Sequence, residues 1–174
     1  MTERTPTRTT NLDRYGFAAL PWSRAHDVLE KGSTGPDVTH FLGTVGPDGR
    51  PYVAGVGAAW LDGDLYFTSN LAARKARNLA SNPACTIAVN LAGIDLSLFG
   101  TAEQVSDAAT LEKIATIYRD GGWPAQVAGD ALTAPYSAPS AGPAPWHVYR
   151  FTFDTVVGVA TAEPYGATRW QFAR

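Results

Sequence analysis

The chain has 174 residues, a length that suits one domain with a substantial hydrophobic core. Its formal net charge of −2 argues against a nucleic-acid binder held mainly by phosphate contacts, and no stretch approaches the roughly 18 apolar residues of a membrane span. The only cysteine, Cys85, excludes an internal disulfide, and the polar N-terminus lacks the apolar core of a signal peptide; both predict a cytoplasmic protein.

The first part of the chain predicts a polar tail and one helix. Residues 1–14 are polar and predict a mobile tail, which leaves residues 15–174 as the single domain. A helix is expected over Trp22–Lys31, with Trp22, Ala25 and Leu29 facing inward and Gly32 at its end.

Three closely spaced strands follow and predict an antiparallel meander. They are expected at Val38–Val45, Tyr52–Leu61 and Leu65–Ser69, and they are joined by tight turns at Pro47-Asp48-Gly49 and Asp62-Gly63-Asp64.

A short helix is expected next. It begins at Leu71 after a cap by Ser69 or Asn70, and Asn82-Pro83 stops it, because a residue before proline avoids the helical region. The inward face predicted from the spacing consists of Ala72, Ala76, Leu79 and Ala80.

The second half of the chain predicts a further hairpin, a helix and two strands. The hairpin pairs Ala84–Leu91 with Ile94–Val105, where Ile94, Leu96 and Leu98 alternate with Asp95, Ser97 and Phe99. The remaining elements are a helix at Asp107–Tyr118 with Leu111, Ile114, Ala115 and Tyr118 inward, a short helical piece within Trp123–Leu132, a surface loop at Thr133–Pro145, and strands at His147–Ala160 and Thr168–Phe172. These elements predict a mainly β protein, a β-barrel of six or seven antiparallel strands with peripheral helices.

Three cations gather where the short helix begins. Arg74 and Lys75 lie in or just after its first turn, where free backbone N–H groups already make a positive end, and Arg77 adds a third charge. Together they suit an anion such as a phosphate, while a solvated basic face is an equally good interpretation of these residues alone.

Other patterns carry less chemistry. Gly55 and Gly57 begin like a dinucleotide-binding fingerprint, but no helix follows. We interpret them as leaving room above the sheet for a ligand or another backbone, and strand bulges are an equally good interpretation. The three histidines lie far apart, which argues against a metal site. Trp170 beside Arg169 is a candidate wall for a flat ligand, although core packing is the commoner role of tryptophan.

The segment Phe67–Ala76, together with Asn82-Pro83-Ala84 and the strand that follows, resembles the pyridoxamine 5′-phosphate oxidase-like family of flavin and deazaflavin split β-barrels. The variant Lys75-Ala76-Arg77-Asn78-Leu79 is similar to the actinobacterial deazaflavin-binding branch, and the ending Ala167–Phe172 to uncharacterised members of it. The resemblance implies an FMN-binding split barrel and a homodimer with the cofactor, FMN or the deazaflavin F420, at its interface. It implies that Arg74, Lys75, Arg77 and Asn78 hold the cofactor phosphate, that Thr68 and Ser69 lie near the ring, and that Arg169 and Trp170 close the pocket.

The resemblance implies an oxidoreductase that transfers hydride to or from a small organic substrate, with no catalytic residue assigned. The chain departs from the oxidases where they carry an arginine and a lysine that contact the flavin, because the corresponding residues here are Ala54 and Ala59. The alternative hypothesis is therefore a non-enzymatic carrier of flavin, haem or another flat ligand on the same barrel.

Overall fold

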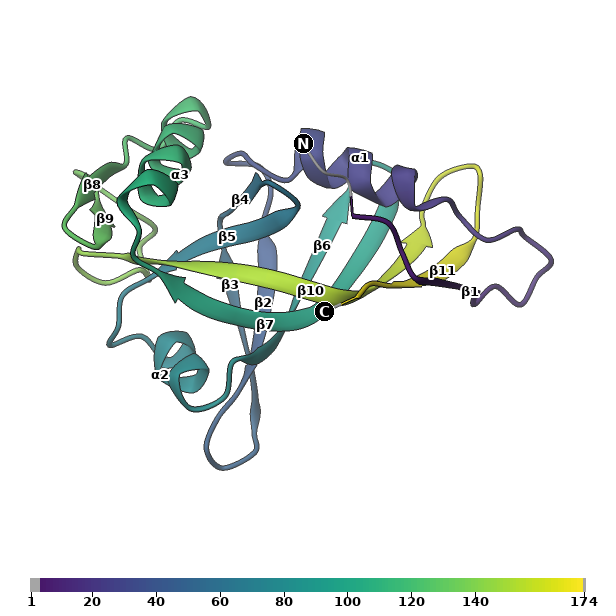
Figure 1. The fold of residues 1–174 in the computed structure, drawn as a ribbon, viewed down its shortest axis with the longest axis horizontal. Helices are drawn as coiled ribbons and strands as arrows, with labels where there is room; N and C mark the ends of the chain where they lie inside the picture. The colour runs from purple at the N-terminus through teal and green to yellow at the C-terminus, as the bar shows by residue number, and fades with distance from the viewer. Residues whose placement is uncertain (1–3, 174) are drawn as a thin grey trace.

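The computed structural model describes residues 4–173 as a large antiparallel sheet with three helices around it (Figure 1). This confirms the predicted mainly β fold with peripheral helices. None of the helices described is long and apolar enough to cross a membrane. The elements are β1 (Arg8–Asn11), α1 (Trp22–Gly32), β2 (His40–Val45), β3 (Pro51–Val56), β4 (Ala58–Leu61), β5 (Asp64–Ser69), α2 (Arg74–Ser81), β6 (Ala84–Leu91), β7 (Ile94–Val105), α3 (Ala108–Asp120), β8 (Gln126–Ala128), β9 (Ala131–Thr133), β10 (His147–Ala160) and β11 (Ala167–Gln171).

The sheet closes through a bend at Gly57. Strand pairing runs β3–β2–β6–β7–β10–β5–β4, and β3 and β4 are consecutive segments joined only by this glycine. The prediction of one strand over Tyr52–Leu61 is therefore wrong: its first half pairs with β2 and its second half with β5. A glycine at the bend lets the chain leave one edge of the sheet and join the other, which brings the two ends of the barrel together.

Strand β10 is long enough to pair with two different strands along the same edge. Its first half pairs with β5 and its second half with β11, while β7 pairs along nearly its whole length. A bulge between Phe153 and Thr155 lies opposite Gly100 of β7, where an added Cβ would come within 2.0 Å of the Thr152 carbonyl oxygen. Only glycine fits this crossing of β7 and β10.

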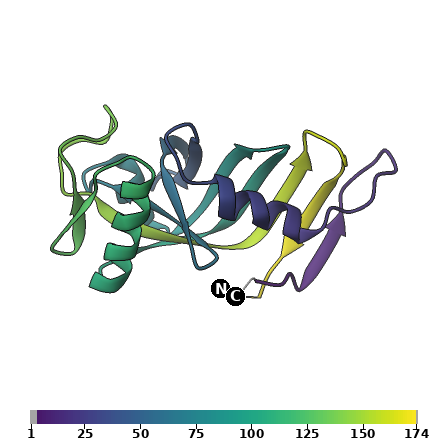
Figure 2. The same cartoon turned by 90° about the horizontal axis from the view of Figure 1, so that it is seen from above.

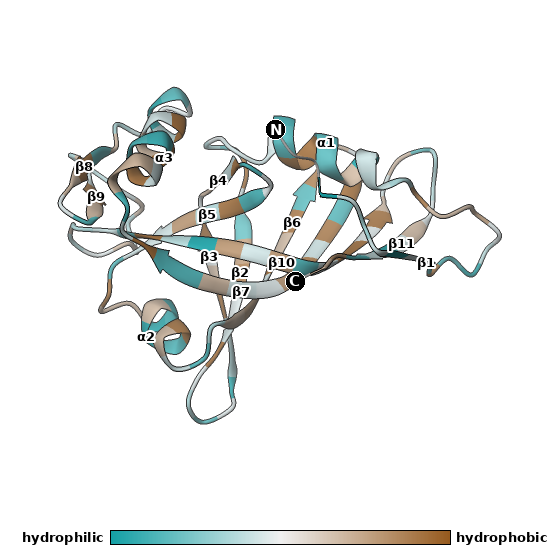
Figure 3. Ribbon diagram, viewed as in Figure 1, coloured by the Kyte–Doolittle hydropathy of each residue, from teal (hydrophilic) through white to brown (hydrophobic). Residues whose placement is uncertain are grey.

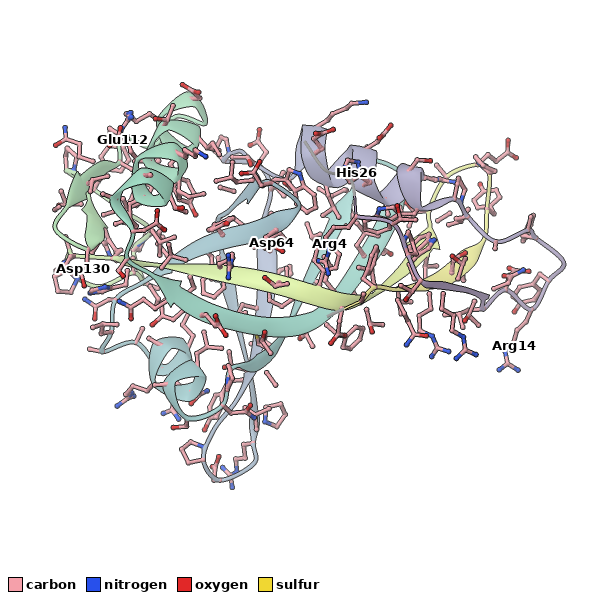
Figure 4. All side chains as sticks on the ribbon, viewed as in Figure 1. Arg4, Arg14, His26, Asp64, Glu112 and Asp130 are labelled. Atoms are coloured by element: carbon pink, nitrogen blue, oxygen red, sulfur yellow. The ribbon has the colours of Figure 1, made fainter. Side chains whose placement is uncertain are left out.

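The predicted mobile tail is wrong where the structure describes a strand. Arg8–Asn11 form β1 and pair with Thr168–Gln171 of β11, and residues 1–3 of the predicted tail lie outside the described residues. Arg4, before β1, also contacts the sheet. Its guanidinium lies 3.8 Å from the Asp64 carboxylate and over the rings of Phe153 and Phe172 (Figure 4). A run of backbone hydrogen bonds thus orders this polar segment without an apolar face of its own.

The hydrophobic core has two parts. The larger one fills the barrel and extends beneath α1, which contributes Trp22, Ala25 and Leu29 as predicted. The smaller one lies under α3, whose predicted inward residues are all buried against β4, β5 and the β8–β9 hairpin. Seen from above, α1 and α3 occupy separate positions along the long axis of the molecule (Figure 2). Each helix therefore covers its own part of the sheet.

The region after α3 differs from its prediction. A short helical piece was expected within Trp123–Leu132, but the chain forms the hairpin β8–β9 instead. Gly129 at its turn has a φ of 64°, which glycine adopts without steric cost. The loop that follows, over residues 134–145, crosses the surface as predicted.

Candidate functional site

Asn70 directs the chain from β5 into α2. Its side-chain oxygen accepts a hydrogen bond from the Ala72 N–H at 2.8 Å, and its carbonyl accepts one from Ala73. These bonds close a turn rather than cap a helix, so α2 begins at Arg74 and not at the predicted Leu71. The side-chain amide of Asn70 also donates to the Pro143 carbonyl at 2.7 Å, which fixes the turn to the long loop.

The N-terminus of α2 has no side-chain cap. The residue before the helix is Ala73, which has no hydrogen-bonding side chain, and no acidic residue lies in the first turn. The N–H groups of Arg74, Lys75 and Ala76 therefore have no acceptor among the described residues. These three donors and the positive end of the helix dipole point to the same side.

Arg74, Lys75 and Arg77, which we call the cation cluster, surround this helix end. The Arg74 guanidinium donates to the Tyr52 hydroxyl at 2.9 Å and lies 4.5 Å from the centre of the Tyr52 ring. Lys75 is half-buried, and burial lowers the pKa of its ammonium group. None of the three forms an ion pair with an acidic side chain within residues 4–173. Their positive charge is therefore left without a counter-ion from the described part of the chain.

Asn78 lies beneath the helix rather than beside the cation cluster. Its side chain is buried and donates to the Thr44 hydroxyl of β2 at 3.0 Å. With Ala76 and Leu79 it forms the inward face of α2, whereas Ala72 and Ala80, which were predicted to share that face, are exposed. Helix α2 shows one apolar and one polar side (Figure 3). In this arrangement Asn78 holds the cation cluster at a fixed place on the barrel.

Thr68 and Ser69 face opposite sides of β5. Ser69 is buried and donates to the Asn70 carbonyl at 3.0 Å. Thr68 is half-buried and borders a cavity of about 550 Å³, which we call the α3 cavity. This cavity lies between β4, β5, the C-terminal end of α3 and the long loop, and its lining includes Gly57, Tyr118, Trp123 and Tyr136. Of the predicted pair, only Thr68 reaches open space.

Arg169 and Trp170 lie apart from the cation cluster within one chain. Trp170 is completely buried, packs against Trp22 at 5.5 Å between ring centres, and donates to the Leu20 carbonyl at 3.2 Å. It is a core residue, so the expectation that it walls a ligand pocket is wrong. Arg169 is half-buried on the opposite face of β11, and β11 lies at the other end of the sheet from α2 (Figure 1).

Sequence reasoning missed Tyr52 and the aromatic lining of the α3 cavity. Tyr52 reaches Arg74 from β3, across 22 positions of sequence. Tyr118 was predicted only as a core residue, and Trp123 and Tyr136 come from segments that the pattern did not connect. No local signal links these residues, because the contacts depend on how α3 and the loop pack on β4 and β5. Gly57 is the exception, since its interpretation as a residue that leaves room above the sheet matches its place in the cavity.

Comparison with known proteins places this geometry in a family. A solved structure described as an F420 reductase is 26% identical, covers 75% of this chain and 94% of its own, and has a TM-score of 0.50. An FMN-binding protein related to pyridoxamine 5′-phosphate oxidase from Nostoc punctiforme PCC 73102 is 21% identical over 91% of this chain and 93% of its own, with a TM-score of 0.55. A heme-binding protein from Mycobacterium smegmatis is 17% identical over 86% of this chain and 59% of its own, with a TM-score of 0.61.

At such identities, the last two likenesses show the fold. No curated protein matches the chain. The family model described as pyridoxamine 5′-phosphate oxidase matches residues 37–160, which include the barrel strands β2 to β7, the cation cluster and the α3 cavity's strand residues. The chain belongs to the pyridoxamine 5′-phosphate oxidase family.

Proposed function

We propose that this protein is an oxidoreductase that binds FMN or the deazaflavin F420 and uses it for hydride transfer to or from a small organic substrate. The observation that carries the proposal is the uncapped N-terminus of α2 with three cations and no acidic partner among the described residues. Its occurrence in a chain of this family supports a phosphate-bearing cofactor over a merely solvated basic helix face.

The donor set fits the phosphate end of either cofactor. Three backbone N–H groups and the side chains of Arg74, Lys75 and Arg77 offer charge-assisted hydrogen bonds to an anion. The Tyr52 ring holds the Arg74 side chain in place, which lowers the entropy that the arginine loses on binding. Lys75 is half-buried and gains a counter-charge when an anion binds, so its pKa rises on binding.

The remaining residues orient ligands rather than carry the reaction. The bound cofactor supplies the hydride chemistry. Thr68 offers a hydroxyl at the edge of the α3 cavity. The Tyr118 hydroxyl lies within hydrogen-bonding distance of the carbonyls of Gly57 and Tyr66, and burial raises its pKa, so it stays protonated and holds β4 and β5. We assign no general acid.

We further propose that two copies of the chain pair through the outer face of the sheet. Val53, Gly43, Thr86 and Phe99 form one row across β3, β2, β6 and β7. Phe41 lies two positions from Gly43 on the same face. The side chains of Phe41, Val53 and Phe99 are 51%, 70% and 43% exposed, which is an unusual apolar exposure for one sheet face.

The mass of the protein in solution tests the dimer. Val53→Arg places a charge at the β3 end of this row, at its most exposed apolar side chain, so we expect a monomer by light scattering. Tyr165→Arg, an exposed aromatic residue outside the row, is the control and leaves the dimer intact. A monomeric wild-type protein, or a dimeric Val53→Arg variant, contradicts this interface.

The second candidate function is a carrier that holds a flat ligand without chemistry. Ala54 and Ala59 favour it, because the strand after the first hairpin offers no cation, and Ala59 is fully buried against α3. The two functions differ in one measurement. An enzyme reduces its bound cofactor with a reduced donor and turns over an acceptor, whereas a carrier keeps the bound chromophore unchanged.

Titration of the full-length protein with FMN and with F420 tests the phosphate site. Lys75→Ala removes one charge-assisted contact, so we expect the dissociation constant to rise about ten- to a hundredfold. Lys113→Ala, on the exposed side of α3, is the matched control and leaves affinity unchanged. Equal affinities for wild type and Lys75→Ala, in a variant that melts at the same temperature, remove Lys75 from the site.

A further inference from the structure

The α3 cavity has walls that are tied together by hydrogen bonds. The Trp123 indole N–H donates to the Tyr136 carbonyl at 2.7 Å, and the Tyr136 hydroxyl donates to the Gly122 carbonyl at 3.3 Å. Trp123 packs edge-on against Tyr118, with 5.2 Å between ring centres. The turn after α3 and the loop around Tyr136 therefore hold each other, and the cavity is a preformed feature of the fold.

No charged side chain lines this cavity in the part of the chain that the structure describes. Its polar groups are the hydroxyls of Thr34, Thr68, Ser137 and the two tyrosines, and the Tyr118 and Tyr136 hydroxyls already meet backbone carbonyls. Glu112 and Asp130, the acidic residues marked on this part of the molecule, are exposed and do not border the cavity (Figure 4). A charged ligand would lose its hydration here and gain no partner.

The shape of the lining selects flat molecules. Aromatic side chains from α3, the turn after it and the loop line the cavity together with glycines at positions 35, 57, 121 and 122, which have no side chain to fill it. An added Cβ at Gly57 would meet nothing within 4 Å, so the space above β4 is open. A volume of about 550 Å³ lies within the range of pockets that bind small organic molecules.

We propose that the α3 cavity binds the substrate and that the substrate is an uncharged, flat, largely apolar organic molecule, not a phosphate ester or a carboxylate. That the ligand is a substrate rests on the proposed oxidoreductase function, because Thr68, which is expected near the cofactor ring, borders the cavity. The ligand class rests on the lining alone. The chain thus separates the two kinds of ligand: the cation cluster takes an anion, and the α3 cavity takes a neutral ring.

A matched pair of probes tests the ligand class. We expect the cofactor-free, full-length protein to bind 2-naphthamide in a calorimetric titration and to bind 2-naphthoate, the anion of the same shape, at least tenfold more weakly. Equal or tighter binding of 2-naphthoate overturns the proposal, and so does a failure of 2-naphthamide to bind.

Two variants locate the binding. Gly57→Leu fills the open space and abolishes 2-naphthamide binding, while Gly32→Leu, at another glycine with nothing within 4 Å of an added Cβ, leaves binding unchanged. Ala138→Leu, in the exposed loop that borders the cavity, gives the same test if Gly57→Leu does not fold. Binding that survives in a folded cavity-filling variant overturns the location.

The titrations separate this proposal from the proposed function. Lys75→Ala weakens FMN or F420 binding and leaves 2-naphthamide binding unchanged. A wild-type protein that binds FMN or F420 but not 2-naphthamide rejects the α3 cavity proposal alone. A wild-type protein that binds 2-naphthamide but neither cofactor rejects the phosphate site alone.

Discussion

His40 makes folding sensitive to acid in a way that the structure allows us to calculate. Its side chain is completely buried at the start of β2, and neither ring nitrogen has a hydrogen-bond partner among residues 4–173. Burial disfavours the charged imidazolium and lowers the pKa from 6.5 to about 4. His40 is therefore neutral in the folded protein at neutral pH.

The sign and size of the effect follow from linkage. Between pH 6.5 and pH 4 the unfolded chain binds a proton at His40 and the folded protein does not, so protonation favours unfolding. The free energy of unfolding then falls as the pH is lowered through this window. The loss is about 2 kcal/mol at pH 5 and about 3.4 kcal/mol below pH 4, because each pKa unit is worth about 1.36 kcal/mol.

Urea unfolding of wild type and His40→Leu at pH 7.5 and pH 5 measures this contribution. Leucine is apolar and does not titrate, so the stability of the variant relative to wild type should improve by about 2 kcal/mol from pH 7.5 to pH 5. The acidic groups are common to both proteins and cancel in the difference. A difference that is the same at the two pH values would refute the reasoning, and so would an imidazole that titrates near 6.5 in the folded protein.

Other predictions concern packing. Gly100→Ala should lower the free energy of unfolding by about 1–3 kcal/mol, because the added Cβ would come within 2.0 Å of the Thr152 carbonyl oxygen. Gly32→Ala is the control in the same urea titration, since its added Cβ meets nothing within 4 Å. Trp170→Ala should cost about 3–5 kcal/mol as a cavity in the core, and a loss below 1 kcal/mol would contradict its burial. Burial raises the pKa of the Cys85 thiol to about 12, so Ellman's reagent at pH 8 should react only after urea unfolds the protein; rapid reaction in the folded state would contradict this.

Local patterns were sufficient where one face of an element is buried. The alternation of Ile94, Leu96 and Leu98 with Asp95, Ser97 and Phe99 predicted β7 with the bounds that the structure has. The isoleucine and the two leucine side chains are buried. Spacing of apolar residues likewise predicted the inward face of α3, and Asp107 caps it by accepting from the Thr110 N–H. In these elements the buried positions repeat with the period of the backbone, so the spacing of apolar residues predicts both the element and its buried face.

Features that depend on distant partners were not predictable from local pattern. The segment of β1 is polar and becomes a strand only because β11, about 160 positions later, offers a free edge. Tyr52–Leu61 has the composition of one strand, and its division at Gly57 follows from closure of the barrel. The same limit applies to the α3 cavity, whose walls come from separate segments of the chain.

The start of α2 shows how a polar turn improves a binding site. A helix that began at Leu71 would have buried the Arg74 and Lys75 N–H groups in its own hydrogen bonds. Because Asn70 closes a turn first, the helix begins at Arg74, and Arg74 and Lys75 each combine a cationic side chain with a free backbone N–H group.

The short connection from Thr68 to Arg74 limits how far apart the two candidate sites can lie. Six residues span at most about 20 Å when fully extended, and the turn at Asn70 shortens this distance. Within that reach the chain passes from an uncharged cavity edge to a positive helix end that no acidic side chain among residues 4–173 pairs with. A cationic side chain inside the cavity would lose its hydration when an apolar ring bound there. It would also compete with α2 for the cofactor phosphate. Alanine at position 54 of β3 and at position 59 of β4 is consistent with this division, since neither strand then offers a cation that competes with the helix for the anion.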